Sequence, residues 1–276
     1  MCWWGGYCVI YCSSNDIWFP NEEYAFRKSI IENDRFEWEN INSKLASKEI
    51  YIRDIYKSWY VTGINRQVDS IDKLVEFLKK EIGGLPTVLI GSSSGGFLAA
   101  TLGCILHAEY VIAFSAQFEL RNKWAEEVNP FLQKFEKDHD KAKYYDLKEL
   151  LAQSTTPIYY IVPIKNELDL YNYKYIQGIN CIHALIFNSK RHGVVVPKCC
   201  LGKLISLSNS ELEKLYDAGR NKTLSPFYFS VKLVGFTSTI VCIIQMAYSK
   251  VYRKIRNNIH ARRKVSSPKM EDDGNA

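Results

Sequence analysis

Residues 87–96 read Thr-Val-Leu-Ile-Gly-Ser-Ser-Ser-Gly-Gly, and this stretch decides how the rest of the chain is interpreted. An apolar run typical of a buried strand enters a cluster of glycines and serines of the form G-x-S-x-G. The following residues 97–102, Phe-Leu-Ala-Ala-Thr-Leu, favour a helix. A strand, a sharp turn with a serine at its tip and a helix are the parts of a nucleophile elbow. The start of such a helix offers free N–H groups and a positive dipole end to a developing oxyanion.

Three serines compete for the tip of this turn. Ser93 has glycines two residues before and after it, where a side chain would collide with the strained turn. Ser94 is sterically poorer because a serine and a glycine flank it, and Ser92 is excluded because an isoleucine stands two residues before it. A phosphate-binding loop is disfavoured, since no Lys-Ser/Thr pair follows the glycines. G-x-S-x-G alone is a weak pattern, and a plain glycine-serine turn is its main competitor.

The composition indicates a globular protein with a neutral body and a basic end. A chain of 276 residues, 47% of them hydrophobic, can bury one large core or one core plus an appendage. Seven Lys and Arg residues and no acidic residue lie between 250 and 264. Without them, 29 basic residues balance 30 acidic ones. The net charge of +6 therefore does not indicate a nucleic-acid-binding domain.

The eight cysteines form no C-x-x-C pair and no zinc-type spacing, so no metal site is expected. Several lie in apolar runs, where a reduced cysteine behaves as a small hydrophobic residue. The first residues, Met-Cys-Trp-Trp, lack the basic region and long apolar core of a signal peptide. We therefore expect a reducing, cytoplasmic location.

Strand-like and helical patterns alternate along the first 207 residues. Apart from the strand at 87, we expect strands at 7–12, 49–53, 110–114, 157–162 and 181–187, and helices at 22–31 and 68–82. Near-continuous apolar strands that alternate with helices are typical of a parallel sheet covered on both faces. The predicted fold class is α/β, with a mostly parallel central sheet and helices on both faces.

A catalytic serine needs a histidine as base and an acid that orients the histidine. Asp169 follows the strand that ends at Val162, and His192 follows the strand that ends at Phe187. Taken singly, Asp169 is explained as a helix cap and His192 as a surface histidine. Together with the elbow serine, however, they give three suitable residue types, in the order Ser, Asp, His, each at the end of a strand. Glu167 is the alternative acid, ranked second because its longer side chain must reach from an earlier loop position.

On these residues, the chain resembles the α/β-hydrolase fold family from about Tyr7 to Leu207. This resemblance implies an oxyanion hole built from Ser14 and Asn15, in the loop after an early strand, and from Ser94, directly after the nucleophile. Residues 13–20 and 53–65 also resemble small bacterial hydrolase-like proteins, often encoded among surface-polysaccharide biosynthesis genes. Ser92 departs from the family pattern, in which a bulkier residue such as His often precedes the nucleophile.

The resemblance also implies how the rest of the chain is divided into a domain and further segments. It implies a hydrolase domain at 1–207 with a lid-like helical insertion at 117–154, whose aromatic residues, with Trp59 and Tyr60, would shape a substrate pocket. A helical extension at 208–265 and a disordered tail at 266–276 follow. Residues 227–248 are mostly apolar, and the basic run comes directly after them. We expect an apolar helix that packs on the domain or makes peripheral contact with the inner face of a membrane through 227–264.

The leading hypothesis is a serine hydrolase of the esterase or deacylase type that needs no cofactor. Its substrate would be a small-molecule or glycan ester, such as a glycan or glycolipid intermediate. Two alternatives stay open. One is a non-catalytic scaffold in a membrane-bound polysaccharide biosynthesis complex, and the other is an acyltransferase that uses the same three residues.

Overall fold

A computed structural model of the protein describes residues 6–122, 131–248 and 252. These residues contain a seven-stranded sheet with the order β2-β1-β3-β4-β5-β6-β7, in which all neighbouring strands are parallel. The strands are β1 (Tyr7–Cys12), β2 (Ala46–Ile52), β3 (Thr87–Ser92), β4 (Tyr110–Phe114), β5 (Ile158–Pro163), β6 (Ile182–Phe187) and β7 (Thr223–Leu224). The prediction of a mostly parallel central sheet is confirmed.

The central strands are apolar on both sides because both faces of the sheet are covered. Every residue of β3, β4 and β5 is buried. Successive side chains of one strand enter opposite cores, as Ile10 of β1 does on one face and Val9 and Tyr11 on the other. Parallel strands buried on both faces read as continuous apolar runs, which is why the sequence revealed them.

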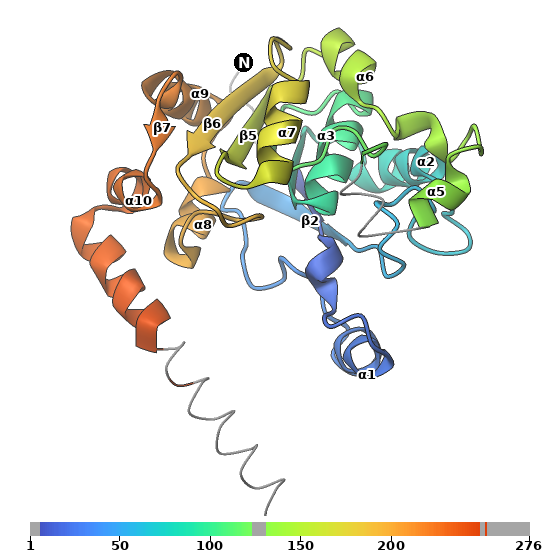
Figure 1. Ribbon diagram of the computed structural model, residues 1–276, viewed down its shortest axis with the longest axis horizontal. Helices are drawn as coiled ribbons and strands as arrows, with labels where there is room; N and C mark the ends of the chain where they lie inside the picture. Colours follow the sequence, from blue (N-terminus) through green and yellow to red (C-terminus); the bar gives the residue numbers. More distant parts are fainter. Residues whose placement is uncertain (1–5, 123–130, 249–251, 253–276) are drawn as a thin grey trace, which may run out of the picture.

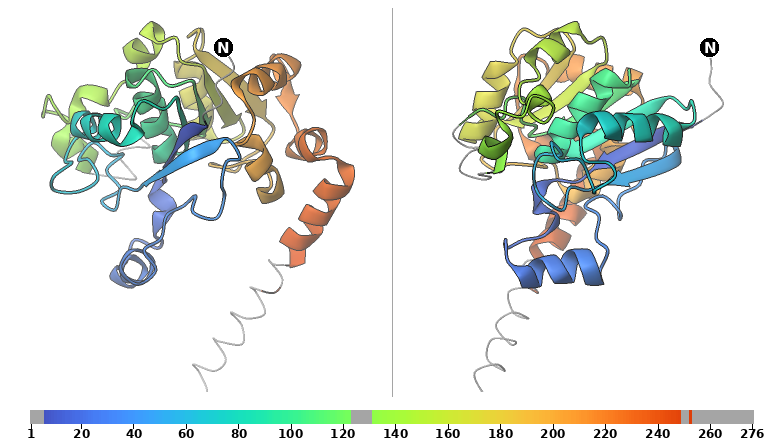
Figure 2. Two further views of the ribbon diagram at one scale, coloured as in Figure 1. Left: turned by 180° about the vertical axis from the view of Figure 1, so that it is seen from behind. Right: turned by 90° about the vertical axis from the view of Figure 1, so that its right-hand side faces the viewer.

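Helices cover both faces, as predicted (Figure 1). The core of one face contains residues of α2 (Ile71–Ile82), α3 (Ser94–Ile105), α6 (Lys148–Gln153) and the end of α7 (Glu167–Tyr175). The core of the other face contains residues of α8 (Lys198–Leu204), α9 (Asn209–Gly219) and α10 (Pro226–Val234), together with Trp38. Figure 2 shows α1 (Glu23–Phe26) and the π-helical turn η2 (Arg27–Glu32) extending away from this body.

Local sequence signals set the bounds of these helices. The side chain of Ser70 caps α2 by accepting a hydrogen bond from the N–H of Lys73, and Gly83 ends the helix in the left-handed region at φ 64°. Ser208 and Glu211 form a capping box at the start of α9. These caps therefore set where α2 and α9 begin, and Gly83 sets where α2 ends.

The segment between β4 and β5 corresponds to the expected lid-like insertion. Its described part contains α5 (Phe131–Phe135), the 3-10 turn η3 (Ala142–Tyr144) and α6, and the side chain of Phe118 packs edge-on against Tyr160 of β5. Residues 123–130, including the expected aromatic residue Trp124, lie outside the described residues. The described part of the insertion is therefore helical and joined to the core through Phe118 and α6.

The body continues beyond residue 207, where we had expected it to end. Helix α9 packs on β6, and β7 adds a seventh strand by pairing with Ile186 and Phe187. Helix α10 then packs on α8, and its Phe229 contacts Phe187 edge-on. The expected continuous apolar helix is interrupted at Gly235, whose φ of 88° ends α10, and residues 236–248 form a separate helix.

A disulfide joins this last helix to the body. Cys199 of α8 bonds to Cys242 across a sequence separation of 43 residues, whereas we had expected reduced cysteines throughout. Among the described residues, five other cysteines, all buried, are free. The sequence did not indicate the pair because 43 residues separate the two cysteines, which meet only where the helix at 236–248 passes beside α8.

No helix in the described part of the chain combines the length and the apolar character needed to cross a membrane. The expected disordered tail at 266–276 lies outside the described residues.

Candidate functional site

The turn between β3 and α3 has the geometry of a nucleophile elbow, with Ser93 at its tip. Ser93 has φ 54° and ψ −121°, a conformation that is costly for a residue with a side chain. Its N–H donates to the carbonyl oxygen of Phe114 at 2.8 Å, which helps to hold the strained residue. The flanking glycines are required by close backbone contacts. A Cβ on Gly91 would lie 2.1 Å from the carbonyl oxygen of Gly95, and a Cβ on Gly95 would lie 2.2 Å from that of Cys12.

The geometry also separates Ser93 from the two rival serines. Ser94 is fully buried, and its hydroxyl donates to Oδ1 of Asn15 at 3.0 Å. Ser92 is 3% exposed and belongs to β3. Ser93 is only partly buried and is the serine whose hydroxyl meets a histidine.

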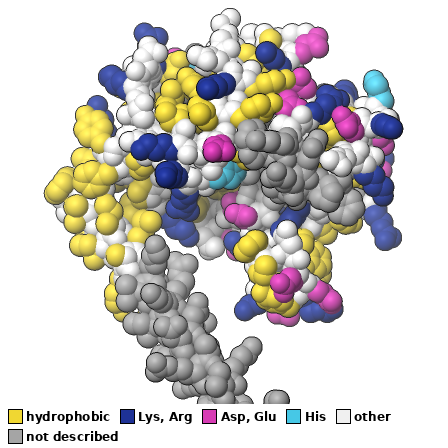
Figure 3. Space-filling view, in the orientation of Figure 1, with side chains coloured by type: hydrophobic (Ala, Val, Ile, Leu, Met, Phe, Trp, Pro, Cys, Tyr) yellow, Lys and Arg dark blue, Asp and Glu magenta, His cyan; other side chains and the backbone are white. Residues whose placement is uncertain are grey.

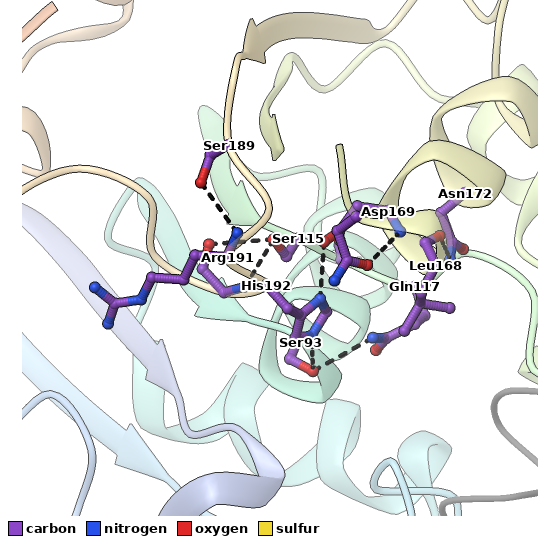
Figure 4. A network of polar contacts seen from close by, with 12 residues as sticks. Ser93, Ser115, Gln117, Leu168, Asp169, Asn172, Ser189, Arg191 and His192 are labelled. Carbon is purple, nitrogen blue, oxygen red and sulfur yellow. Dashed lines mark hydrogen bonds and ion pairs between the residues drawn. The ribbon is translucent and has the colours of Figure 1, made fainter. Parts of the chain in front are cut away.

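Ser93, His192 and Asp169 form a hydrogen-bonded chain (Figure 4). Nε2 of His192 lies 2.9 Å from Oγ of Ser93, and Nδ1 lies 2.9 Å from Oδ2 of Asp169. The carboxyl group is 1% exposed, whereas the imidazole is 32% exposed. The ring therefore links a buried carboxyl group to a hydroxyl group on a partly exposed serine. This is the relative arrangement that general-base activation of a serine requires.

The acid comes from the first turn of α7. Asn166 caps that helix by accepting a hydrogen bond from the N–H of Asp169 at 3.2 Å, so Asp169 is not itself the cap. The alternative acid, Glu167, is the first residue of α7 and is exposed, and its side chain makes no hydrogen bond to His192 within the described residues. The structure brings Asp169, and not Glu167, to the histidine.

The loop that carries His192 is fastened to the end of β4. Oγ of Ser115 accepts a hydrogen bond from the N–H of Gly193 at 2.9 Å and donates to its carbonyl oxygen at 3.1 Å. Gly193 has φ 84°, which a residue with a side chain rarely adopts. On the other side of the histidine, Oγ of Ser189 accepts the N–H of Arg191 at 3.1 Å. Figure 4 shows Ser189 within the loop and Ser115 beside it, each with its hydrogen bonds to the loop backbone.

The predicted oxyanion residues lie together beside the elbow, but they differ in what their groups do. Asn15 and Ser94 are linked by their side chains. The N–H of Ser94 lies in the first turn of α3, where the helix itself does not use it. The N–H of Ser14, in contrast, donates to the carboxyl group of Glu37. Burial raises the pKa of Glu37, and the hydrogen bonds from Ser14 partly offset that rise.

Gln117 is a site residue that the sequence analysis did not single out. Its Nε2 donates to Oγ of Ser93 at 3.3 Å, and its Oε1 accepts a hydrogen bond from Nε1 of Trp59 at 3.0 Å. An indole nitrogen can only donate, so the amide oxygen must face Trp59 and the NH₂ group must face the serine. Gln117 follows a buried strand at the same edge of the sheet as the acid and the histidine. That shared position was the signal that would have found it.

The two predicted pocket aromatics are buried supports. Trp59 is 3% exposed, and Tyr60 has no exposed surface. The hydroxyl of Tyr60 donates to the carbonyl oxygen of Ser13 at 2.6 Å, directly beneath the loop that carries Ser14 and Asn15. Trp59 and Tyr60 have φ of 53° and 61°, and buried Asp54 holds this turn by accepting the N–H of Tyr60 at 3.0 Å.

Asn172 joins the acid's helix to the segment that carries Gln117. Its Oδ1 accepts the N–H of Phe118 at 2.8 Å, and its Nδ2 donates to the carbonyl oxygen of Leu168 at 2.9 Å. The side chain has no exposed surface. One buried amide therefore fixes the position of Gln117 relative to Asp169.

A pocket of about 290 Å³ lies between the loop after β2 and helix α5. Its lining residues are Tyr56, Ser58, Thr62, Lys134 and Phe135. They come from the two segments in which we expected substrate contacts, but Trp59 and Tyr60 are not among them. In the described ranges, no group of three or more His, Cys, Asp and Glu side chains is placed to hold a metal ion.

A parallel sheet whose strand leads into a serine elbow, followed by an acid and a histidine after later strands, is the arrangement of the α/β-hydrolase fold. No protein-family model and no curated protein sequence matches the chain. Among solved structures, the capsule O-acetyltransferase of Neisseria meningitidis serogroup A is similar, with 13% identity and a TM-score of 0.46 over 63% of this chain and 73% of that one.

Two further similar structures are hydrolases. The 2,6-dihydroxy-pseudo-oxynicotine hydrolase has 12% identity and a TM-score of 0.43, over 82% of this chain and 64% of that one. The α/β hydrolase MGS-M2, from a Medee basin deep-sea metagenome library, has 12% identity and a TM-score of 0.39, over 67% of this chain and 82% of that one.

Proposed function

We propose that this α/β-hydrolase-fold protein is a serine-dependent acyl-transfer enzyme that acts on esters. The observation that carries the proposal is His192, whose two ring nitrogens each lie 2.9 Å from a partner, Oγ of Ser93 on one side and Oδ2 of Asp169 on the other. A histidine that only occupied a surface loop would need neither a buried carboxyl group beside Nδ1 nor a serine in a strained conformation beside Nε2.

The first half of the reaction forms an acyl-enzyme. Oγ of Ser93 attacks the carbonyl carbon of the ester while Nε2 of His192 takes the hydroxyl proton. Asp169 keeps the proton on Nδ1 and stabilises the imidazolium that forms. When the tetrahedral intermediate collapses, the bond between the carbonyl carbon and the alcohol oxygen breaks. His192 returns its proton to that oxygen, and the alcohol leaves.

The second half releases the acyl group. A water molecule attacks the acyl-enzyme, gives a proton to His192 and displaces Ser93, which takes the proton back. In both halves of the reaction, the donors proposed for the oxyanion are the N–H of Ser94 and that of the neighbouring Asn15. If an alcohol replaces water in this step, the same residues perform an acyl transfer rather than a hydrolysis.

The substrate class proposed is a small-molecule or glycan ester. The narrower choice of a glycan or glycolipid intermediate rests on the resemblance of residues 13–20 and 53–65 to polysaccharide-associated proteins. Hydrolysis is preferred over transfer as the proposed reaction because it needs no second substrate.

Reaction with a fluorophosphonate tests the proposal without knowledge of the natural ester. We expect stoichiometric labelling of the wild type, loss of labelling in Ser93→Ala, and slow labelling in His192→Ala. Ser94→Ala serves as the matched control, because it removes a neighbouring hydroxyl and leaves the proposed nucleophile in place. Circular dichroism checks that each variant is folded.

Two outcomes would overturn the proposal. Labelling that persists in Ser93→Ala and disappears in Ser94→Ala would move the nucleophile by one residue. A folded wild type that is not labelled would favour the non-catalytic scaffold instead. If labelling behaves as expected, a panel of acyl esters with and without added alcohols separates hydrolase from transferase by the product that accumulates.

A further inference from the structure

The helix at residues 236–248 is unusual for a segment at the surface of a water-soluble domain. It extends away from the body after the break at Gly235 and lies on the same side as α1 in all three views (Figures 1 and 2). Its large apolar side chains are exposed, with Phe236 at 63%, Ile244 at 62% and Tyr248 at 71%. Its contact with the body includes the disulfide from Cys242 to α8.

Most of the circumference of this helix is apolar. The sequence from 236 to 248 contains no charged residue. At about 100° per residue, the exposed apolar positions 236, 241, 243, 244, 246 and 248 spread over an arc of about 220°, and the exposed Ser238 and Gln245 lie together on the remaining side. Only Thr239 and Cys242 are buried. A helix whose exposed apolar side chains cover more than half of its circumference is normally in contact with protein or lipid, because a helix in water carries polar residues on its outer face.

Helix α10 enlarges the apolar surface. Phe227 and Tyr228 are 43% and 54% exposed, whereas the next residue, Phe229, is buried against β6. Figure 3 shows apolar side chains gathered over α10 and the helix that follows it. Contiguous apolar surfaces of this kind mark sites of interaction with a protein or a membrane.

The charge of the adjoining sequence decides between these partners. Directly after the helix, residues 250–264 carry seven Lys and Arg and no Asp or Glu, whereas the rest of the chain is close to neutral. A bilayer with anionic headgroups presents phosphate charge beside hydrocarbon. Each cationic side chain next to the membrane contributes to the free energy of binding. Each apolar side chain adds the free energy of its transfer from water into the lipid.

We infer that the helix at 236–248, together with Phe227 and Tyr228 of α10, docks the protein on the surface of an anionic lipid bilayer. The basic run at 250–264 supplies attraction to the headgroups, and the exposed apolar side chains enter the boundary between headgroups and acyl chains. The inference does not depend on the catalytic role of Ser93, because the surface is formed by other residues and elements.

Co-sedimentation of the full chain with vesicles tests this inference. The vesicles are phosphatidylcholine alone, or phosphatidylcholine mixed with phosphatidylglycerol, at about 0.1 M and about 1 M salt, between which the Debye length falls from about 10 to about 3 Å. We expect strong binding to the anionic vesicles, weaker binding to neutral ones, and release from the anionic vesicles at high salt.

Two variants locate the surface. Phe236→Ser combined with Ile244→Ser removes two exposed apolar side chains. We expect the partition coefficient of this double variant onto anionic vesicles to fall by about tenfold or more. Phe77→Ser is the matched control, since Phe77 is 41% exposed on α2, and it should bind as the wild type does. Circular dichroism spectra and thermal unfolding midpoints should be equal in all three proteins, which shows that each is folded.

The inference is overturned if the double variant binds as tightly as the wild type, or if neutral and anionic vesicles are bound equally. It is also overturned if analytical ultracentrifugation without lipid finds a dimer of the wild type that the double variant abolishes. A second copy of the chain would then cover the helix.

Discussion

Replacing Gln117 tests whether its contact with Ser93, the proposed nucleophile, contributes to the proposed reaction. The side chain donates Nε2–H to Oγ of Ser93 at 3.3 Å and is oriented by Trp59. In Gln117→Ala this donor is lost. A net contribution of about 0.5–1.5 kcal/mol for a neutral hydrogen bond corresponds to about a two- to twelvefold slower reaction. The 3.3 Å distance favours the lower part of that range.

Gln117→Glu should be worse than Gln117→Ala. A carboxylate at this position replaces the donor by a negative oxygen close to the developing oxyanion. Two like charges 4 Å apart repel by about 4 kcal/mol at an effective dielectric constant of about 20, so a further loss of about 10²- to 10³-fold is expected. Because a protonated Glu can donate, the rate ratio of Gln117→Glu to Gln117→Ala should rise as the pH falls.

The assay is the second-order rate constant for fluorophosphonate labelling, measured across pH for each variant. Trp59→Phe should slow labelling less than Gln117→Ala, since it removes only the group that orients the amide. Gln153→Ala, a substitution in α6, is the control and should have no effect. The reasoning is refuted if Gln117→Ala reacts at the wild-type rate, or if the Glu and Ala variants agree within twofold at every pH.

Three further predictions concern stability. Asp54→Asn should cost about 1–3 kcal/mol in urea unfolding, because an amide cannot accept every hydrogen bond that both carboxyl oxygens accept, among them the one from the N–H of Tyr60. Glu37→Gln should flatten the pH dependence of unfolding. Burial raises the pKa of Glu37 above its ordinary 4.5, so the wild type loses stability as pH rises from near that value through the raised pKa, while the amide still accepts the N–H of Ser14. Gly95→Ala should destabilise by about 3 kcal/mol or more, since its Cβ would lie 2.2 Å from a backbone oxygen of β1.

Each of these has a result that would contradict it. If Asp54→Asn were as stable as the wild type, the free-energy cost of burying the carboxylate would equal the stabilisation that its hydrogen bonds provide. A Glu37→Gln protein whose stability follows pH as the wild type does would assign the slope to other groups. For the glycine, Gly202→Ala is the control, because nothing lies within 4 Å of its Cβ and alanine favours a helix by about 0.5–1 kcal/mol. Equal stability of the two alanine variants would refute the steric argument.

The parts of the site that the sequence could predict are those with a local signature. Glycines two residues on either side of Ser93 are a local requirement of the turn, and they distinguish it from Ser94 without knowledge of the fold. Asp169 and His192 each follow an apolar run, so the rule that carboxyl ends of parallel strands share one edge was sufficient to bring them to the serine.

The parts that the sequence could not predict depend on contacts between distant segments. Gln117 acquires its orientation from Trp59, 58 residues away. The N–H of Ser14 appears available from the sequence, but Glu37, 23 residues on, accepts its hydrogen bond. Strand β7 has only two residues, which is too short to produce a periodic pattern. Gly235, in contrast, was a visible signal for a helix end and was overlooked because the run around it is apolar.

The amide of Asn172 links two parts of the site that come from distant segments of the chain. Through it, the segment that carries Gln117 is bonded to the helix that carries Asp169, so the groups that act on the nucleophile and its base are held as one unit. Of the two proposed oxyanion donors, Asn15 lies on the loop after β1, and Tyr60 of the loop after β2 supports that loop at the carbonyl oxygen of Ser13. The hydrogen bond from Trp59 to Gln117 joins the loop after β2 to the unit of Gln117 and Asp169 as well. A substitution that displaces the turn at Trp59 and Tyr60 would therefore reach the proposed nucleophile and the proposed oxyanion donors together.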